Sequence, residues 1–328
     1  MNLKKVKKLL VVRLSSLGDI LLTTPLIRTI KKKYPDIEID FVLRKEYYDL
    51  LKLNPYINNI HLFTNDGNDK IGSVIQKNNY DLIIDLQNNI RSKKLLKNSG
   101  AEIVSHNKNN FRKFLLVYFK INKLKNALPI PEKYARTIKD FELDNEGLDL
   151  FTDKNSFYFD ADTAKLIGLC PGAKHFTKRW SKNYYIELSK LLEQNDYQVV
   201  LFGGKNDNQL CNEIRSGFPN AIDLSNNDDI LQTAADVKSC KAIFCNDSGL
   251  MHVATAVKVP VIAFFGSTVR EFGFFPYKTK SIVLENSNLS CRPCSHIGKN
   301  KCPKKHFKCM LDISPQLAYN KLKSFVAT

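Results

Sequence analysis

The sequence lacks any long hydrophobic run. None of its apolar stretches approaches the roughly 18 uninterrupted apolar residues that a membrane-spanning helix needs. The N-terminal segment passes from lysines directly into the apolar stretch at Leu9, without the small-residue cleavage site of a secretory signal. These absences argue against a membrane-spanning or exported protein, and we expect a cytoplasmic one.

Acidic residues are scarce, since 33 Asp and Glu stand against 50 Lys and Arg, for a formal net charge of +17. The deficit is largest between residues 88 and 139, where thirteen basic residues accompany only Glu102 and Glu132. Because aromatic and aliphatic residues lie among them, as in Phe111 to Lys120, the segment favours an anionic membrane surface or a phosphorylated amphiphile as partner. A solvated lysine-rich face is the alternative. Helix-turn-helix, zinc-finger and RNA-recognition signatures are absent, which argues against nucleic acid.

The cysteines do not form the framework of a secreted disulfide protein. Four of the eight lie in or beside apolar segments, as buried reduced thiols do: Cys170, Cys211, Cys240 and Cys245. The other four form a C-terminal run: Cys291-x2-Cys294-x7-Cys302-x6-Cys309. This run predicts a structural zinc site, although its spacing departs from C-x2-C…C-x2-C. Six basic residues and no acids between Arg292 and Lys308 leave an acceptor or membrane face as the alternative.

The chain of 328 residues, 43% of them apolar, is long enough for two domains. In the first half, short apolar strands alternate with helical stretches, beginning with a strand at Leu9–Arg13. Residues from about 129 to 160 carry prolines and acids without this alternation, which starts again at Leu166–Cys170. We therefore expect an α/β protein of two doubly wound domains, 1–155 and 156–328, with a cleft between them.

A strand–helix–strand pattern in the second half is the strongest local signal. Two apolar runs, Ala242–Cys245 and Val259–Phe265, flank a segment of helical spacing and predict two parallel strands around a helix. Asp247 or Ser248 can cap this helix, and Gly249 lets the backbone approach a ligand closely. The N–H groups of the first turn then form a site for a phosphate or diphosphate. An ordinary capped helix is the alternative.

A second strand–turn–helix lies near the N-terminus. The turn after the strand contains Ser15, Ser16 and Gly18, which have small side chains and an accessible backbone. Asp19 follows at the expected helix start, where the helix dipole stabilises a carboxylate, and a simple N-cap is the alternative role. Pro25 lies inside the helical stretch and is expected to kink or restart it.

Several motifs together resemble glycosyltransferase family 9, which contains the lipopolysaccharide heptosyltransferases. The motifs are Arg13-Leu-Ser-Ser-Leu-Gly-Asp19, Cys170-Pro-Gly-Ala-Lys174 with Lys178-Arg-Trp180, Phe202-Gly-Gly204, and Asn246-Asp-Ser-Gly-Leu-Met-His252 with Phe265-Gly266. Residues 168–267 are most similar to the heptosyltransferase II branch. The resemblance implies the GT-B fold, in which two Rossmann-like domains face each other across a cleft.

The resemblance also implies an inverting transfer that needs no metal or other cofactor. The donor would be a nucleotide sugar, usually ADP-heptose, and the acceptor a phosphorylated, lipid-linked saccharide of the lipopolysaccharide inner core. The expected partners are therefore these two substrates and an anionic inner-membrane surface, without nucleic acid. We expect the protein to be peripheral on the inner face of the inner membrane.

Site roles are carried over from the family residue by residue. Asp19 matches the general base for the acceptor hydroxyl, and Lys178 supplies positive charge to the departing diphosphate. The other expected substrate ligands are Ser15, Ser16, Gly18, Lys174, Asp207, Asp247, Ser248, Gly249, Leu250, Met251 and His252. Of these, Asp247 would hold sugar hydroxyls, Asp207 the ribose, and His252 the diphosphate.

Alternatives remain for some of these residues. His252 can be a buried helix histidine, Asp207 a surface cap, and the lysines at 174 and 178 part of a solvated loop. The heptosyltransferase I branch has threonines where this chain has Ala173 and Lys174. This chain therefore lacks the hydroxyl groups that would contact the phosphate at these positions.

Two other classes of function stay open. One is a non-transferring GT-B enzyme, such as a nucleotide-sugar epimerase, and the other is a basic binding protein without turnover. Asp19 and the basic segment between residues 88 and 139 favour the transferase, because a binding protein needs neither a base nor a phosphate-seeking surface.

Overall fold

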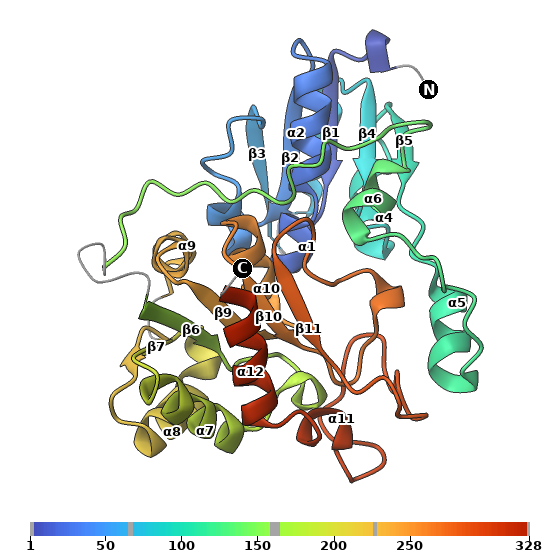
Figure 1. Cartoon of the computed structure of the whole chain (residues 1–328). Helices are drawn as coiled ribbons and strands as arrows, with labels where there is room; N and C mark the ends of the chain where they lie inside the picture. Colours follow the sequence, from blue (N-terminus) through green and yellow to red (C-terminus); the bar gives the residue numbers. More distant parts are fainter. Residues whose placement is uncertain (1–2, 65–67, 158–164, 226–227, 327–328) are drawn as a thin grey trace. The chain divides into compact units, whose positions relative to one another are not determined.

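The computed structural model describes residues 3–64, 68–157, 165–225 and 228–326. The chain forms two compact units (Figure 1). The first unit contains Met1–Lys108 and Leu128–Phe151, and the second contains Asn109–Ala127 and Thr152–Thr328. A single boundary at residue 155 does not account for the excursion of residues 109–127, because packing contacts rather than chain order decide which unit a segment joins.

The first unit contains a parallel five-stranded sheet in the order β3-β2-β1-β4-β5. Its strands are β1 (Lys8–Val12), β2 (Glu38–Arg44), β3 (Asn59–Phe63), β4 (Leu82–Asp85) and β5 (Glu102–Ser105). The chain moves outward from β1 through β2 to β3 and then returns to the other side of β1. The strand order therefore reverses between β1 and β4, and such a switch point is where open α/β sheets bind ligands.

The second unit contains a parallel six-stranded sheet in the order β11-β10-β9-β6-β7-β8. Its strands are β6 (Leu166–Cys170), β7 (Gln198–Leu201), β8 (Ile222–Asp223), β9 (Ala242–Asn246), β10 (Val261–Phe264) and β11 (Ser281–Leu284). Here the order reverses between β6 and β9. The loops after these two strands therefore flank the expected ligand crevice of this unit.

Helices connect the strands, as the alternating pattern predicts. The α-helices of the first unit are α1 (Leu17–Leu21), α2 (Thr24–Lys33), α3 (Asn68–Lys77), α4 (Ile90–Leu96) and α6 (Ile130–Ala135). Those of the second unit are α5 (Asn110–Phe114), α7 (Lys182–Glu193), α8 (Asn208–Gly217), α9 (Ile230–Lys238), α10 (Gly249–Ala256), α11 (Lys308–Leu311) and α12 (Pro315–Val326).

Two local predictions can be compared directly with these helices. Pro25 lies in the first turn of α2, where its missing N–H costs nothing, so the predicted restart of the helix is confirmed. The connector after β2, where the alternating pattern also predicts a helix, is instead the short 3-10 helix η2 (Lys45–Leu50). This connector is short, contains two tyrosines, which have modest helix propensity, and is soon followed by Pro55. A longer α-helix is therefore not favoured here.

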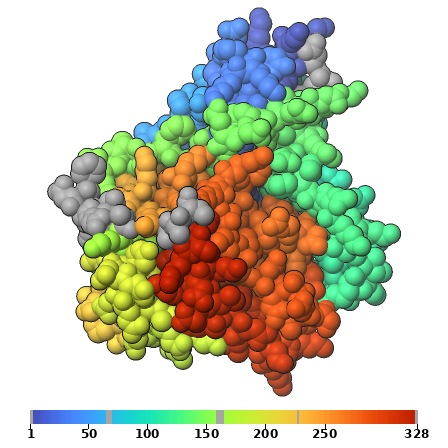
Figure 2. All heavy atoms as spheres, in the orientation of Figure 1, coloured from blue at the N-terminus to red at the C-terminus, as the bar shows by residue number. Residues whose placement is uncertain are grey.

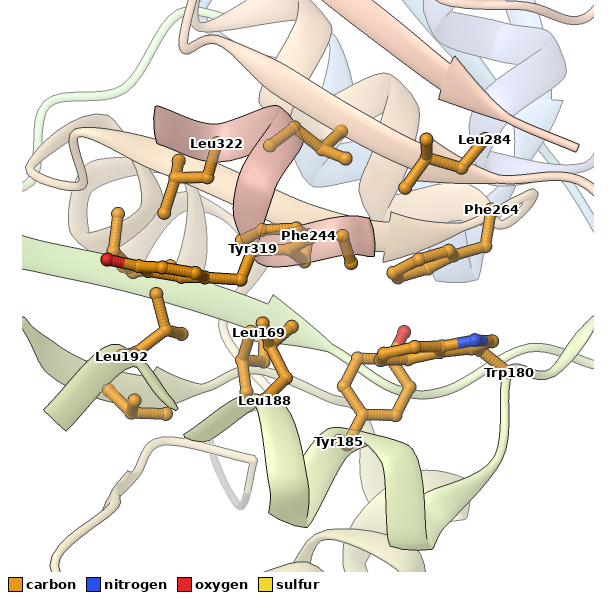
Figure 3. Close-up of a cluster of buried hydrophobic side chains, with 14 of the residues drawn as sticks. Leu169, Trp180, Tyr185, Leu188, Leu192, Phe244, Phe264, Leu284, Tyr319 and Leu322 are labelled. Carbon is orange, nitrogen blue, oxygen red and sulfur yellow. The ribbon is translucent and has the colours of Figure 1, made fainter. Parts of the chain in front are cut away.

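The hydrophobic core of the second unit reaches directly to the loop after β6. Trp180 is 2% exposed, stacks on Phe264 of β10 with ring centroids 4.2 Å apart, and donates from its indole nitrogen to the Ile313 carbonyl at 2.9 Å. Tyr185 and Leu188 of α7 pack below them (Figure 3). Because burial of a Trp contributes a few kcal/mol, it fixes the end of that loop on the core.

In the described part of the chain, no helix has the length and apolar character required to cross a bilayer.

Candidate active site

The turn after β1 holds Asp19 through both of its carboxylate oxygens. One oxygen accepts hydrogen bonds from the backbone N–H and hydroxyl of Ser16, at 3.2 and 2.8 Å, so that Asp19 closes a capping box at the third position of α1. The other oxygen pairs with the Arg13 guanidinium at 2.6 Å. Burial alone would raise the pKa of Asp19, but the Arg13 charge and the Ser16 hydrogen bonds outweigh it and lower that pKa. Asp19 is therefore ionised at neutral pH.

Arg13 is fixed as firmly as the carboxylate that it pairs with. Its guanidinium also donates to the Leu86 carbonyl at 2.7 Å and to the Ser15 carbonyl at 2.9 Å. The Gln87 side-chain oxygen accepts from the Leu14 and Ser15 amides. Loops after β1 and β4 thus meet at the switch point of the first sheet, with Asp19 between polar partners.

The four expected residues of this turn play different parts. Ser16 and Asp19 bond to each other, the Ser15 backbone binds Arg13 and Gln87, and buried Gly18 accepts a helical hydrogen bond from Leu22. Sequence reasoning quoted Arg13 only as part of a motif and missed Gln87. An arginine directly after an apolar strand was the available signal for Arg13, which the structure buries, whereas no local pattern marks Gln87.

In the second unit, the N-terminus of α10 follows β9 directly. Ser248 occupies the N-cap position with an extended backbone, but its side chain makes no capping hydrogen bond. Its hydroxyl oxygen is buried and has no hydrogen-bond partner among the described residues. The backbone at Ser248, Gly249 and Leu250 belongs to residues of intermediate exposure, whereas Met251 and His252 are buried. This turn has the N–H groups and the spare hydroxyl that a phosphate oxygen would bind.

A cation lies beside this turn. The Lys178 ammonium pairs with Asp247 at 2.7 Å, and the Thr268 hydroxyl donates to the same carboxylate oxygen, also at 2.7 Å. The side chains of Lys178 and Asp247 are 17% and 7% exposed, so the pair is largely shielded from solvent. Loops after β6, β9 and β10 supply one group each. Thr268 was not anticipated from the sequence.

The loop after β6 is held in place from both ends. Asn246, the last residue of β9, donates to the Pro171 carbonyl at 2.8 Å and accepts from the Trp180 amide at 2.9 Å. Arg179 closes the loop by donating to the Ala173 carbonyl at 2.7 Å. Lys178 is therefore carried by a structured loop rather than a solvated one.

Lys174 lies at the start of this loop and is exposed, so the structure does not bring it into the ion pair of Lys178. Its charge still acts on the neighbouring His175. Burial and the charges of Lys178, Lys174 and Arg179 lower the pKa of His175. The loop is thus a region of positive potential, which suits an anionic ligand.

Asp207 lies at the loop after β7 and accepts from the Gly204 amide at 3.2 Å. It thereby closes the first turn of the 3-10 helix η6 (Lys205–Asp207). Its carboxylate also lies over Gly172, where an added Cβ would come within 2.4 Å of three of its atoms. The structure thus brings Asp207 to the loop that carries Lys178, and Gly172 makes this approach possible.

The cysteine-rich C-terminal segment packs against the same loop. Thr177 donates its amide to the Lys299 carbonyl at 3.0 Å and accepts from the Lys299 amide at 2.8 Å. Buried Arg292 donates to the carbonyls of Gly266 and Thr268, at 2.6 and 2.9 Å, and pairs with Glu285 at 2.7 Å. Arg292 therefore fixes the strand end that presents Thr268 to Asp247.

The four C-terminal cysteines are the residues predicted to hold a structural zinc ion. Burial raises the pKa of Cys309 to about 12, with smaller contributions from the neighbouring cysteines. Within the described ranges, no group of three or more His, Cys, Asp or Glu side chains is placed to hold a metal ion. The zinc site at Cys291, Cys294, Cys302 and Cys309 gains no support from this geometry and stays a prediction.

Comparisons with known proteins agree with this architecture. Residues 69–305 match the model of glycosyltransferase family 9 (heptosyltransferase). Lipopolysaccharide heptosyltransferase 2 of Escherichia coli K12 is 28% identical, over 97% of this chain and 98% of that protein. Lipooligosaccharide heptosyltransferase 2 of Campylobacter jejuni is 32% identical, over 48% of this chain and 51% of that protein.

Two solved structures superpose over nearly the whole chain. A family 9 glycosyltransferase from Veillonella parvula has a TM-score of 0.80 at 23% identity and covers 98% of this chain and 97% of its own. The E. coli ADP-heptose lipopolysaccharide heptosyltransferase II has a TM-score of 0.76 at 25% identity and covers 98% of both chains. The predicted family and GT-B fold are confirmed. The chain belongs to glycosyltransferase family 9, the heptosyltransferase family of enzymes.

Proposed function

We propose that this enzyme transfers heptose, with inversion and without a metal ion, from ADP-heptose to a lipopolysaccharide inner-core acceptor. The observation that carries the proposal is the α10 turn. There the buried Ser248 hydroxyl, which has no hydrogen-bond partner in the described part of the chain, and a partly exposed helix N-terminus adjoin the Lys178 ammonium. Such a turn suits the diphosphate of a nucleotide sugar. The name of the E. coli structure, which includes ADP-heptose, supports the choice of donor.

The transfer itself is a single displacement. The acceptor hydroxyl loses its proton to the Asp19 carboxylate while its oxygen bonds to the anomeric carbon of heptose. The bond from that carbon to the diphosphate oxygen breaks, and ADP leaves with the electron pair. Because attack and departure occur on opposite faces of the sugar, the configuration inverts.

The negative charge that develops on the leaving diphosphate decides the roles that we propose for the residues of the second unit. Lys178 and the N–H groups of Ser248 to Met251 stabilise the negative charge on the departing diphosphate, with His252 as a further ligand. In the structure Lys178 is paired with Asp247. When the diphosphate replaces Asp247 as the partner of the Lys178 ammonium, the Asp247 carboxylate can accept hydrogen bonds from sugar hydroxyls. Asp207, which reaches the same loop, would hold the ribose, and Lys174 would add charge at the rim.

The acceptor is phosphorylated and lipid-linked in this proposal. Positive charge near Asp19 supports it, since burial and the Arg13 charge lower the pKa of Lys108, which lies near both residues. A phosphate placed there would gain from both cations. Because its acceptor is anchored in lipid, we place the enzyme at the cytoplasmic face of the inner membrane, as a peripheral protein.

The test is a panel of nucleotide sugars incubated with the purified enzyme, with and without an inner-core acceptor. We expect ADP release from ADP-heptose to require the acceptor, and the acceptor to gain one heptose. Conversion of a nucleotide sugar to its epimer without acceptor would assign an epimerase instead. Tight binding of a nucleotide sugar without any turnover would assign a binding protein.

A further inference from the structure

The segment 109–127 packs on the second unit through one of its faces. The hydrophobic residues of this face, Leu116, Val117 and Leu124, pack in one buried cluster with Phe272. Lys120 donates from its ammonium to the carbonyls of Cys291 and Pro293, at 3.1 and 2.7 Å. Asn122 donates to Glu271 at 2.8 Å. These contacts hold α5 and the π-helical turn η3 (Leu115–Phe119) firmly on the second unit.

Aromatic side chains cover the other face. Four rings are exposed to solvent: Phe111 by 72%, Phe114 by 47%, Tyr118 by 65% and Phe119 by 61%. Three of them form a cluster, with Phe114 lying 4.8 Å from Tyr118 and 5.8 Å from Phe119 between ring centroids, and Phe111 precedes Phe114 on α5. Single exposed rings are ordinary on a protein surface, but a contiguous aromatic cluster marks an interaction site.

The chain segment that carries this cluster and the segment beside it contain basic but no acidic side chains. Residues 109–127 contain five basic side chains and no acidic one. Lys120 is used internally, whereas Arg112, Lys123 and Lys125 of the same segment are exposed. The adjoining cysteine-rich segment adds five exposed lysines and no acid between residues 292 and 308: Lys299, Lys301, Lys304, Lys305 and Lys308. In Figure 2 the teal α5 region lies at the surface beside the orange C-terminal spheres of its unit.

We propose that this aromatic–basic face, formed by the rings of Phe111, Phe114, Tyr118 and Phe119 and these exposed cations, docks on an anionic lipid bilayer. Phenylalanine and tyrosine rings insert at the boundary between head groups and acyl chains, while lysines and arginines bind lipid phosphates. A second copy of this chain is a poor occupant, because it would bring the same cations together. A protein interface would place fewer lysines around its aromatic core.

This inference rests on the proposed function in one respect, namely that the acceptor resides in a membrane. It adds which part of the protein meets the lipid. The docking element is an excursion from the first half of the chain, but it belongs to the second unit, which carries the α10 turn. Docking would therefore hold the donor-binding unit at the bilayer, at high local concentration of the acceptor.

The experiment is flotation of the full-length protein with vesicles of phosphatidylcholine alone or with about a third phosphatidylglycerol. We expect at least about a tenfold higher partition coefficient on the anionic vesicles, falling as salt rises. Phe111→Gln with Phe119→Gln should lower it about tenfold, as should Arg112→Gln, Lys123→Gln and Lys125→Gln together. The matched control removes three exposed lysines elsewhere on the same unit: Lys190→Gln, Lys238→Gln and Lys321→Gln.

Unchanged flotation of both docking variants would overturn the proposal, as would equal binding of the unmodified protein to neutral vesicles. Loss of self-association in the aromatic variant, measured by sedimentation velocity, would assign the face to a second copy instead. Transfer to a delipidated, soluble acceptor separates this proposal from the proposed function. If that transfer succeeds while flotation fails, only the docking is wrong. If flotation succeeds without any transfer, only the function is wrong.

Discussion

In the proposed mechanism Asp19 is the general base, and its ion pair with Arg13 decides the charge state in which it acts. The arginine keeps the carboxylate ionised, but a carboxylate with a lowered pKa is also a weak base. Proximity to the acceptor hydroxyl, rather than base strength, must then supply much of its effect. The capping box adds orientation, because Ser16 and Arg13 together leave Asp19 little freedom.

Replacement of Arg13 should change the pH dependence of the enzyme. In Arg13→Gln burial is no longer opposed by the arginine charge, so the pKa of Asp19 should rise. Because the base works only when deprotonated, activity should be lost at a higher pH on acidification than in the unmodified enzyme. The measurement is kcat against pH. Arg13→Lys keeps the charge and should move the acid limb less, whereas an unmoved limb in Arg13→Gln would refute the pairing.

The pair of Lys178 and Asp247 allows structural and functional roles to be separated. Lys178→Met leaves a nearly buried carboxylate without its cation, which should lower the free energy of unfolding by about 3 kcal/mol. Adding Asp247→Asn removes that charge and should restore most of the stability, but not the turnover. Denaturant unfolding and transfer assays on both variants check this. Recovery of turnover in the double variant would reduce Lys178 to a structural residue.

At the scale of elements, the strand–turn–helix units were predictable because their signals are local. Apolar runs of β9 and β10, the helical spacing between them and Gly249 all lie within one stretch of chain. The same holds for β1 and Asp19. Partners that arrive from elsewhere were not predictable. Thr268 and Arg292 reach the site only because β10 lies beside β9 and the C-terminal segment folds back over it.

The loop after β6 and the loop after β7 meet at a glycine. An added methyl group at Gly172 would collide with the Asp207 carboxylate, so Gly172→Ala should displace this side chain from its place over Gly172. We expect weaker binding of ADP, measured by calorimetry, and a loss of only about 1 kcal/mol in stability, measured by unfolding, because one hydrogen bond of Asp207 is at stake. Gly204→Ala is the matched control, because nothing lies within 4 Å of the added group and its backbone suits alanine. Equal binding of ADP by the two variants would contradict the proposal that Asp207 binds the ribose.

At the scale of the whole molecule, two parallel sheets each have their candidate site at a switch point. The alternation of strands and helices in both halves predicted this architecture. It did not predict that residues 109–127 join the second unit, because their hydrophobic partner Phe272 lies far along the chain. Long-range packing of this kind leaves no periodic signal in a single sequence.

Hydrogen exchange can locate the nucleotide on the molecule. Saturating ADP should protect the loop after β6 and the first turn of α10, since a ligand stabilises the segments that it binds. At a hundred times its dissociation constant it should stabilise its unit by about 2.7 kcal/mol. Exchange followed by mass spectrometry provides the map. Protection confined to the turn that holds Asp19 would contradict the assignment of the donor to the second unit.

The central claim is that Asp19 serves transfer from ADP-heptose to an inner-core acceptor. The most direct measurement compares acceptor-dependent heptose transfer by the unmodified enzyme and by Asp19→Asn, at saturating donor and acceptor. We expect kcat to fall by about 10²–10⁴-fold while ADP binding and thermal unfolding stay close to normal, because asparagine keeps the size but accepts no proton. The control Asp36→Asn changes an exposed carboxylate and should have no effect. Full turnover by Asp19→Asn, or no heptose on the acceptor with the unmodified enzyme, would contradict the account.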